Sequence, residues 1–196
     1  MKYTQVNIES WNRQEHYNFY RQIQCNFSLT TDIDVTNVVA LYKRNNYKFY
    51  PVMIYLLTKA VNSSSAFKMA MKEGELIEWD EVVPTYTIFN PDIETFSSLW
   101  TEYDEDLHTF ILYYQEDFEQ YQHHISSVPW TTVSGFDLSF PEVKDYFVPI
   151  LTMGKFYEKD GKILLPLAIQ VHHAVCDGFH VGKLIETLQD LCLEAQ

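Results

Sequence analysis

An apolar run that ends in two adjacent histidines constrains the fold of this chain more than any other feature. The run 163–169, Ile-Leu-Leu-Pro-Leu-Ala-Ile, has the two-residue period of a β-strand. Beyond Asp177 and Gly178, apolar residues recur over residues 181–192 at the spacing of a helix face. We therefore predict a strand that ends near residues 172–173, then a turn, and then a helix whose N-terminus is capped by Asp177.

The two histidines at the end of this strand lie on opposite faces if the alternation continues to residue 173. One interpretation is that both are ordinary polar residues near a strand end. A second is that His173, partly removed from water, serves as a general base. A third is a metal site made of His172, His173, Asp177 and His180. Opposed faces and the absence of HExxH or CxxC spacing argue against the metal, and spacing alone leaves the first two interpretations open.

Residues 172–178, His-His-Ala-Val-Cys-Asp-Gly, match the HHxxxDG motif of acyl-CoA-dependent acyltransferases. The longer string 166–181 resembles the type A chloramphenicol acetyltransferases, and the resemblance covers essentially the whole chain, including the segments 48–55 and 94–97. It implies an α/β fold with two layers, in which helices cover a mixed, largely antiparallel sheet. It also implies a single acyltransferase domain, residues 1–196, that assembles as a homotrimer with active sites between subunits.

The function implied by this resemblance is transfer of an acetyl group from acetyl-CoA to a hydroxyl of chloramphenicol, which gives antibiotic resistance. His173 would be the general base, with its tautomer fixed by a hydrogen bond to its own backbone carbonyl. Ser126, in a Ser-x-x-Pro-Trp context, would stabilise the oxyanion, and Thr152 would hold a water near the tetrahedral intermediate. Acetyl-CoA would be a co-substrate, with no permanently bound cofactor and no metal.

The resemblance also implies residues that support the site or bind its substrates. Arg13, in a Trp-x-Arg motif, would form a buried salt bridge with Asp177 and so hold the segment that carries the base. Trp130 and Phe156 would contact CoA. The implied acceptor-binding residues are Phe19, Tyr20, Cys25, Phe27, Phe96, Ser98, Phe136, Leu138, Phe140 and Ile150.

Two departures from the family pattern lie beside the implied acceptor site. The link before Ser126 is shorter than the loop of the family, and one residue is missing between Tyr20 and Cys25. These departures give an alternative function, the same acyl transfer to a different hydroxyl or thiol acceptor. A non-catalytic trimer, in which His173 and Asp177 are structural, is a further alternative from another class.

The hydrophobic content and the net charge of the chain limit the classes of partner that it can bind. With 196 residues, of which 46% are hydrophobic, the chain has the apolar material for one core. A formal net charge of -13 disfavours nucleic acids and anionic membranes as partners. The N-terminal residues lack a signal-peptide core, and the three cysteines have no metal spacing, so we expect reduced thiols in a cytoplasmic protein. These cysteines are Cys25, Cys176 and Cys192.

Periodicity and turn signals predict the remaining elements. We expect strands over residues 26–35, 67–71, 76–79, 84–89, 94–100, 125–130, 147–157 and 162–172. We expect helices over residues 11–21, 36–44, 52–61 and 104–123. Ser10 and Asp104 are the expected N-caps of the first and last of these helices, and Pro51 is expected in the first turn of the third. The sequence Asp160-Gly161 predicts a hairpin before the last strand.

Overall fold

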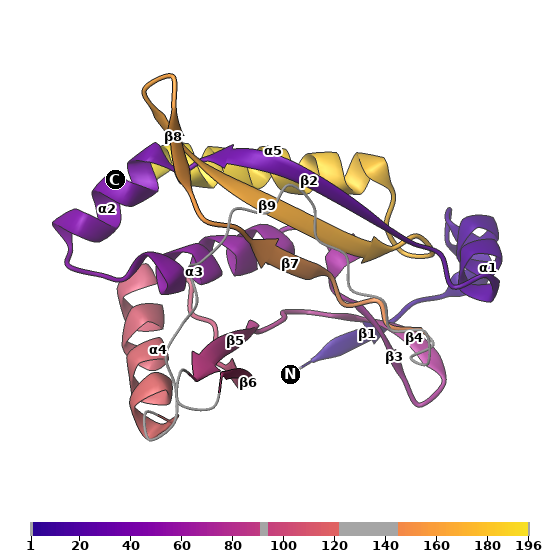
Figure 1. The fold of residues 1–196 in the computed structure, drawn as a ribbon. Helices are drawn as coiled ribbons and strands as arrows, with labels where there is room; N and C mark the ends of the chain where they lie inside the picture. The colour runs from indigo at the N-terminus through magenta and orange to yellow at the C-terminus, as the bar shows by residue number, and fades with distance from the viewer. Residues whose placement is uncertain (1, 91–93, 122–144, 196) are drawn as a thin grey trace.

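The computed structural model describes residues 2–90, 94–121 and 145–195. Its central sheet has the strand order β2-β9-β7, and a fourth strand, β8, pairs with the first half of β9 (Figure 1). These strands are β2 (Asn26–Asp34), β7 (Ile150–Met153), β8 (Tyr157–Lys159) and β9 (Lys162–His172). Every ladder of this sheet is antiparallel. From Leu165 onward β9 is buried on both faces, which explains its nearly continuous apolar sequence.

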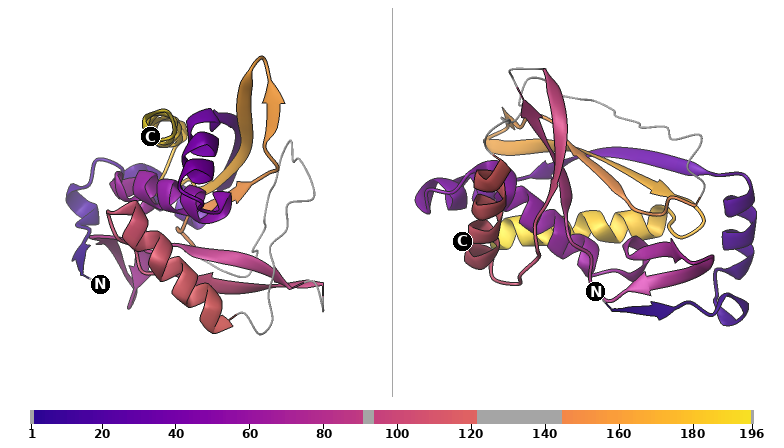
Figure 2. Two further views of the ribbon diagram at one scale, coloured as in Figure 1. Left: turned by 90° about the vertical axis from the view of Figure 1, so that its left-hand side faces the viewer. Right: turned by 90° about the horizontal axis from the view of Figure 1, so that it is seen from below.

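Three helices lie on one side of the central sheet (Figure 2). They are α2 (Thr36–Arg44), α3 (Phe49–Asn62) and α5 (Gly178–Glu194), which pack against one another. The core lies between these helices and β9, and its fully buried side chains include Leu165, Leu167, Ile169, Val181 and Leu188. The apolar alternation of β9 and the helical period of α5 therefore meet in one layer, as the sequence predicts.

Two smaller antiparallel sheets complete the described structure. One has the order β1-β4-β3, and the other is the β5-β6 pair, beside which α4 packs on α3 (Figure 1). Their elements are β1 (Tyr3–Gln5), β3 (Met69–Lys72), β4 (Glu75–Trp79), β5 (Thr85–Asn90), β6 (Thr95–Trp100) and α4 (Leu107–Tyr121). Short 3-10 turns span Ile8–Ser10 and Ser65–Phe67.

Helix α1 (Gln14–Gln22) stands at the end of the central sheet where β9 ends and β2 begins (Figure 1). This placement brings the N-terminal part of the chain next to residues 172–178. Within the described residues, no helix is long and apolar enough to cross a membrane.

The predicted α/β class with a largely antiparallel sheet is confirmed, and most predicted elements are present within a few residues. The helix predicted over 36–44 has the observed bounds of α2. Pro51 lies in the first turn of α3, which begins two residues before it. The hairpin between β8 and β9 turns at Asp160 and Gly161, with φ of 52° and 76°, the left-handed conformation that Asp-Gly favours.

The two expected N-caps are wrong. Helix α1 begins at Gln14 with Arg13 in the cap position, while Ser10 ends a 3-10 turn and its hydroxyl donates to the carbonyl of Asn7. Before α4, the carboxylate of Asp106 accepts hydrogen bonds from the backbone N–H and the hydroxyl of Thr109. A cap must directly precede the first helical residue. Both helices begin three or more residues after the residue expected to cap them.

Two strand predictions also need correction or qualification. The strand predicted over residues 147–157 is interrupted, and its parts are the separate strands β7 and β8. The strand predicted over residues 125–130 lies outside the described residues.

Candidate active site

His173 occupies the turn that follows β9, one residue beyond the end of the strand. Its backbone N–H donates to the carbonyl oxygen of Cys25 at 2.7 Å, which extends the contact between β9 and the start of β2. The ring of Tyr20, from α1, stacks on the imidazole with centroids 3.9 Å apart and planes 12° apart. Phe27 meets the imidazole edge-on, with centroids 5.1 Å apart. Aromatic rings from two elements therefore hold a half-buried imidazole.

The hydrogen bond of His173 indicates its tautomer. Its Nδ1 lies 3.1 Å from the carbonyl oxygen of Cys176. A carbonyl oxygen is an acceptor, so Nδ1 carries a proton, and in the neutral ring Nε2 has the lone pair. The acceptor differs from the expected one, the carbonyl oxygen of His173 itself, which instead receives a hydrogen bond from Nη2 of Arg13 at 3.2 Å. A backbone carbonyl three residues ahead takes over the expected role.

Arg13 and Asp177 form an ion pair beside this imidazole, with Nη1 and Oδ2 2.5 Å apart. Oδ1 of Asp177 accepts hydrogen bonds from the N–H groups of Phe179 and His180, so the same carboxylate caps α5. The ring of His180 also approaches Oδ1, at 2.7 Å from Nδ1. Burial alone would raise the pKa of Asp177, but the hydrogen bonds from Arg13 and His180 outweigh it and hold that pKa well below its usual range. Asp177 is therefore an anion that fixes the turn to α5 and, through Arg13, the backbone of the base.

His172 points away from this arrangement and is 2% exposed. Its Nδ1 accepts the backbone N–H of Ala174 at 3.1 Å, so its proton is on Nε2, which finds no partner among the described residues. The ring packs edge-on against Phe147, with centroids 5.0 Å apart. Burial lowers the pKa of His172. The two histidines thus have different tasks, one shaping the turn and the other facing Tyr20.

The donors of the metal interpretation are engaged with one another and with protein groups. Asp177 holds Arg13 and His180, and Nδ1 of His172 holds a backbone N–H. In the part of the chain that the structure describes, no group of three or more His, Cys, Asp or Glu side chains could hold a metal ion.

Thr152 and Ile150 lie on β7, the other neighbour of β9. In the ladder Ile150 is opposite Gln170 and Thr152 is opposite Ala168. Side chains opposite each other in a ladder share a face, so both belong to the face of His172. Within one chain, the expected water-binding threonine is therefore not on the face that continues to His173.

The other predicted residues fall into three groups. Phe19 on α1 and Phe96 on β6 are 58% and 56% exposed, and Ser98 on β6 is exposed as well. Phe156 packs edge-on against Phe49 of α3, with centroids 4.9 Å apart. Residues outside the described part of the chain are Ser126, Trp130, Phe136, Leu138 and Phe140.

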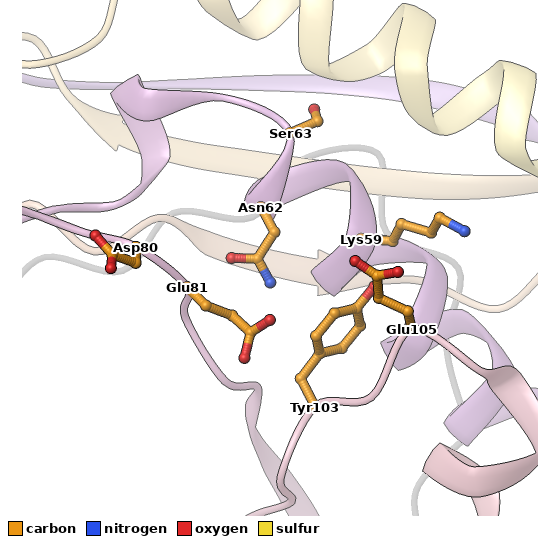
Figure 3. A pocket seen from close by; sticks show the side chains of 7 residues that line it. All are labelled: Lys59, Asn62, Ser63, Asp80, Glu81, Tyr103 and Glu105. Atoms are coloured by element: carbon orange, nitrogen blue, oxygen red, sulfur yellow. The ribbon is translucent and has the colours of Figure 1, made fainter. Parts of the chain in front are cut away.

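A polar pocket of about 400 Å³ lies at the C-terminal end of α3, and none of the predicted site residues lines it (Figure 3). Its lining residues are Lys59, Asn62, Ser63, Asp80, Glu81, Tyr103 and Glu105. The side-chain amide of Asn62 donates a hydrogen bond to the carbonyl oxygen of Val82 and accepts one from the backbone N–H of Val82. This pocket is separate from the surroundings of His173.

Comparison with known proteins identifies the family. A family model described as chloramphenicol acetyltransferase matches residues 1–189. The chain belongs to the chloramphenicol acetyltransferase family. It is 44% identical to chloramphenicol acetyltransferase 2 of Haemophilus influenzae, over 98% of both chains. It is 42% identical to a chloramphenicol acetyltransferase of Escherichia coli, over 99% of this chain and 95% of the relative.

A solved structure of a chloramphenicol acetyltransferase shares this fold. The two superpose with a TM-score of 0.84 at 20% sequence identity, over 97% of this chain and all of the other.

Sequence reasoning missed three residues that contact the surroundings of His173. The guanidinium of Arg21 and the carboxylate of Asp145 are joined by two hydrogen bonds, each 2.7 Å long. Gln24 bonds to the backbone of both residues. The hydrogen-bonded partners Arg21 and Asp145 are 124 positions apart in the sequence, so no local pattern relates them.

Proposed function

We propose that this chain transfers the acetyl group of acetyl-CoA to a hydroxyl of chloramphenicol. The observation that carries the proposal is the imidazole of His173, whose Nδ1 donates to a backbone carbonyl, so that Nε2 is the nitrogen that can accept a proton. The relatives that share 42% and 44% of its residues over nearly their whole length are named chloramphenicol acetyltransferases. The protein would thereby act as a single-domain antibiotic-resistance enzyme of the cytoplasm.

In the proposed reaction, Nε2 of His173 takes the proton of the acceptor hydroxyl as that oxygen attacks the thioester carbonyl carbon. The carbonyl electrons move onto oxygen, and the hydroxyl of Ser126 donates a hydrogen bond to this oxyanion. When the intermediate collapses, the carbon–sulfur bond breaks and the imidazolium returns its proton to the CoA sulfur. Thr152 holds a water near the intermediate, and no acyl-enzyme is formed.

Arg13 and Asp177 have a positioning role in this scheme. Arg13 binds both the carboxylate of Asp177 and the backbone oxygen of His173, so it supports the base without exchanging a proton. Two contacts from one guanidinium restrict both the position of the turn and the direction of the imidazole.

Substrate contacts follow the family resemblance. The proposed CoA contacts are Trp130 and Phe156, and the proposed acceptor contacts are Phe19, Tyr20, Cys25, Phe27, Phe96, Ser98, Phe136, Leu138, Phe140 and Ile150. Tyr20 and Phe27 already touch the imidazole, which supports their place beside the reacting atoms.

We also propose a homotrimer in which each active site lies between two subunits. Phe19 and Phe96 are exposed in the single chain, and Thr152 lies on a different face of the sheet from the one that leads to His173. A second copy facing the His173 turn would cover such apolar side chains and supply the missing side of the site.

The test is release of free CoA from acetyl-CoA in the presence of chloramphenicol. We expect His173→Ala to lower kcat by roughly 10²–10⁴-fold, the usual contribution of a general base. His108→Ala, which removes an imidazole from α4, is the matched control and should retain wild-type turnover. Full turnover by His173→Ala would overturn the mechanism. A wild-type protein inert with chloramphenicol but active on another hydroxyl or thiol would establish the alternative acceptor, and absence of saturable acetyl-CoA binding would indicate a non-catalytic trimer.

A further inference from the structure

We propose that Asp145 is a positioning residue for His173, acting through the turn of residues 20–25, which consists of the end of α1 and the link to β2. The proposal concerns the base of the acetyl transfer and so rests on the proposed function. Its structural part, the coupling of Asp145 to the imidazole, can be measured without turnover.

Asp145 holds this turn at two points. Its carboxylate accepts hydrogen bonds from Nε and Nη2 of Arg21, both 2.7 Å long, in the two-point geometry of a guanidinium–carboxylate pair. Its backbone N–H donates to Oε1 of Gln24 at 3.4 Å. The amide nitrogen of Gln24 in turn donates to the carbonyl of Arg21 at 2.7 Å. Asp145, Arg21 and Gln24 thus form a closed set of hydrogen bonds at the C-terminal end of α1.

Two of these three residues have an unfavourable backbone conformation that the hydrogen bonds stabilise. Gln24 has φ of 50° and Asp145 has φ of 60°, left-handed values that residues with a side chain rarely adopt. Such conformations persist where the surrounding structure over-determines them. The hydrogen bonds that join both residues to Arg21, with the one between Gln24 and Asp145, supply that constraint.

The turn that Asp145 holds is the one that contacts the base. The ring of Tyr20, next to Arg21 in the sequence, stacks on the imidazole of His173. The carbonyl of Cys25, next to Gln24, accepts the backbone N–H of His173 at 2.7 Å. The ring and the backbone of the base are therefore both fixed by neighbours of the two residues that Asp145 binds.

Asp145 also fixes the segment that supports the second histidine. Phe147, two residues further on, is 2% exposed and packs edge-on against Tyr17 of α1 and against His172. The guanidinium of Arg21 lies 5.5 Å from the ring centre of Tyr17. A displacement of the segment around Asp145 would therefore alter the contacts of both His172 and His173.

The solvent exposure of Arg21 and Asp145 limits how much their ion pair contributes to the stability of the fold. The side chains of Arg21 and Asp145 are 36% and 22% exposed, and ion pairs in contact with water add little to stability. Two parallel hydrogen bonds nevertheless define an orientation. We therefore expect loss of the pair to lower catalytic efficiency through a displaced base much more than it lowers the stability of the fold.

The decisive variant is Asp145→Asn, which keeps the size of the side chain and removes its charge. The matched control is Glu78→Gln, because Glu78 pairs with Lys68 at 3.6 Å and similar exposure, 33%, but on β4, away from His173. For both variants we would measure kcat and KM for acetyl-CoA, thermal unfolding, and the imidazole C–H proton signals of His173. These signals are assigned by their loss in His173→Gln, and the ring current of Tyr20 shifts them.

We expect Asp145→Asn to shift the His173 signals and to lower kcat by roughly 10- to 100-fold, as displacement of a catalytic group does, with KM for acetyl-CoA little changed. Glu78→Gln should change none of these quantities. Unchanged His173 signals and unchanged kcat in folded Asp145→Asn would overturn the proposal while leaving the acetyl transfer intact.

A wild-type protein without acetyltransferase activity would instead refute the proposed function, and the proton signals would still report on the coupling. Should Asp145→Asn fail to fold, Arg21→Lys, which keeps both charges and removes the two-point geometry, replaces it with the same expected results. Loss of folding in both variants would make the pair a determinant of the fold and overturn its positioning role.

Discussion

Tyr20 lies flat against His173, with ring centroids 3.9 Å apart and planes inclined by 12°. The tyrosine belongs to α1 and the histidine to the turn after β9, so the contact joins segments about 150 residues apart in the sequence. Together with the Nδ1 contact to the Cys176 carbonyl, the stack fixes both the plane of the imidazole and its rotation within that plane. These two contacts therefore fix the direction in which Nε2 points.

The stack predicts a difference between two substitutions of Tyr20. Tyr20→Phe keeps the ring, and we expect its kcat to stay within about threefold of wild type. Tyr20→Leu removes an aromatic pair worth about 0.5–1.5 kcal/mol, which corresponds to a loss of roughly 2- to 10-fold in kcat. Steady-state rates at saturating acetyl-CoA and acceptor measure the difference. Equal rates for the two variants would show that the stack does not orient the base.

The double role of Asp177 predicts an order of stability among three proteins. Asp177→Ala removes the partner of Arg13 and the cap of α5, and we expect it to lower the free energy of unfolding by about 3–5 kcal/mol. Asp177→Asn keeps a side-chain oxygen for the cap and should recover about 1 kcal/mol of this loss. Urea unfolding of wild type and both variants measures the order, and an alanine variant as stable as the asparagine variant would contradict it.

What the sequence reveals about this site depends on how local each interaction is. The strand that leads to His173 and the cap Asp177 follow from periodicity and from residues a few positions apart, and both were predictable. Tyr20 and Phe27 entered through the family resemblance, without any indication that they hold the ring. The contacts of Asp145 with Arg21 and Gln24 span more than 120 positions, and a surface-type sequence around residue 145 carries no signal of them.

The errors in the fold have a related cause. Ser10 and Asp104 have the chemistry of N-caps, but each lies a few residues before the true start of its helix. A 3-10 turn precedes α1, and the side chain of Asp106 is already in place before α4. Several polar residues near a helix start satisfy the same local rule, so the sequence does not specify at which of them the helix begins.

The cysteines predict a selective reaction with thiol reagents. Burial raises the pKa of the Cys176 and Cys192 thiols to about 12, and both side chains are buried, so almost no thiolate is present at pH 8. Cys25 is partly exposed. We expect the native protein to release one equivalent of chromophore from a disulfide reagent, and the denatured protein three. The native reaction should disappear in Cys25→Ser, and its persistence there would show that a buried thiol is accessible.

The buried imidazole of His172 predicts that the protein loses stability as the pH is lowered through a defined window. Burial lowers its pKa in the folded state below the ordinary value of 6.5, so between these two values the unfolded chain binds a proton that the folded chain excludes. Stability is therefore complete above about pH 6.5 and is lost as the pH falls from there toward the folded-state pKa. Protonation of Nδ1 would also break the hydrogen bond from the N–H of Ala174.

His172→Asn removes this titration, because the amide oxygen can accept the same N–H but takes up no proton near neutral pH. We expect the melting temperature of wild type to fall more between pH 7 and pH 5 than that of His172→Asn, since all other titrating groups are shared. Thermal unfolding at pH 5, 6 and 7 measures the two slopes. Parallel slopes would mean that His172 binds its proton equally well in the folded and unfolded chains, contrary to an imidazole enclosed by β9 and Phe147.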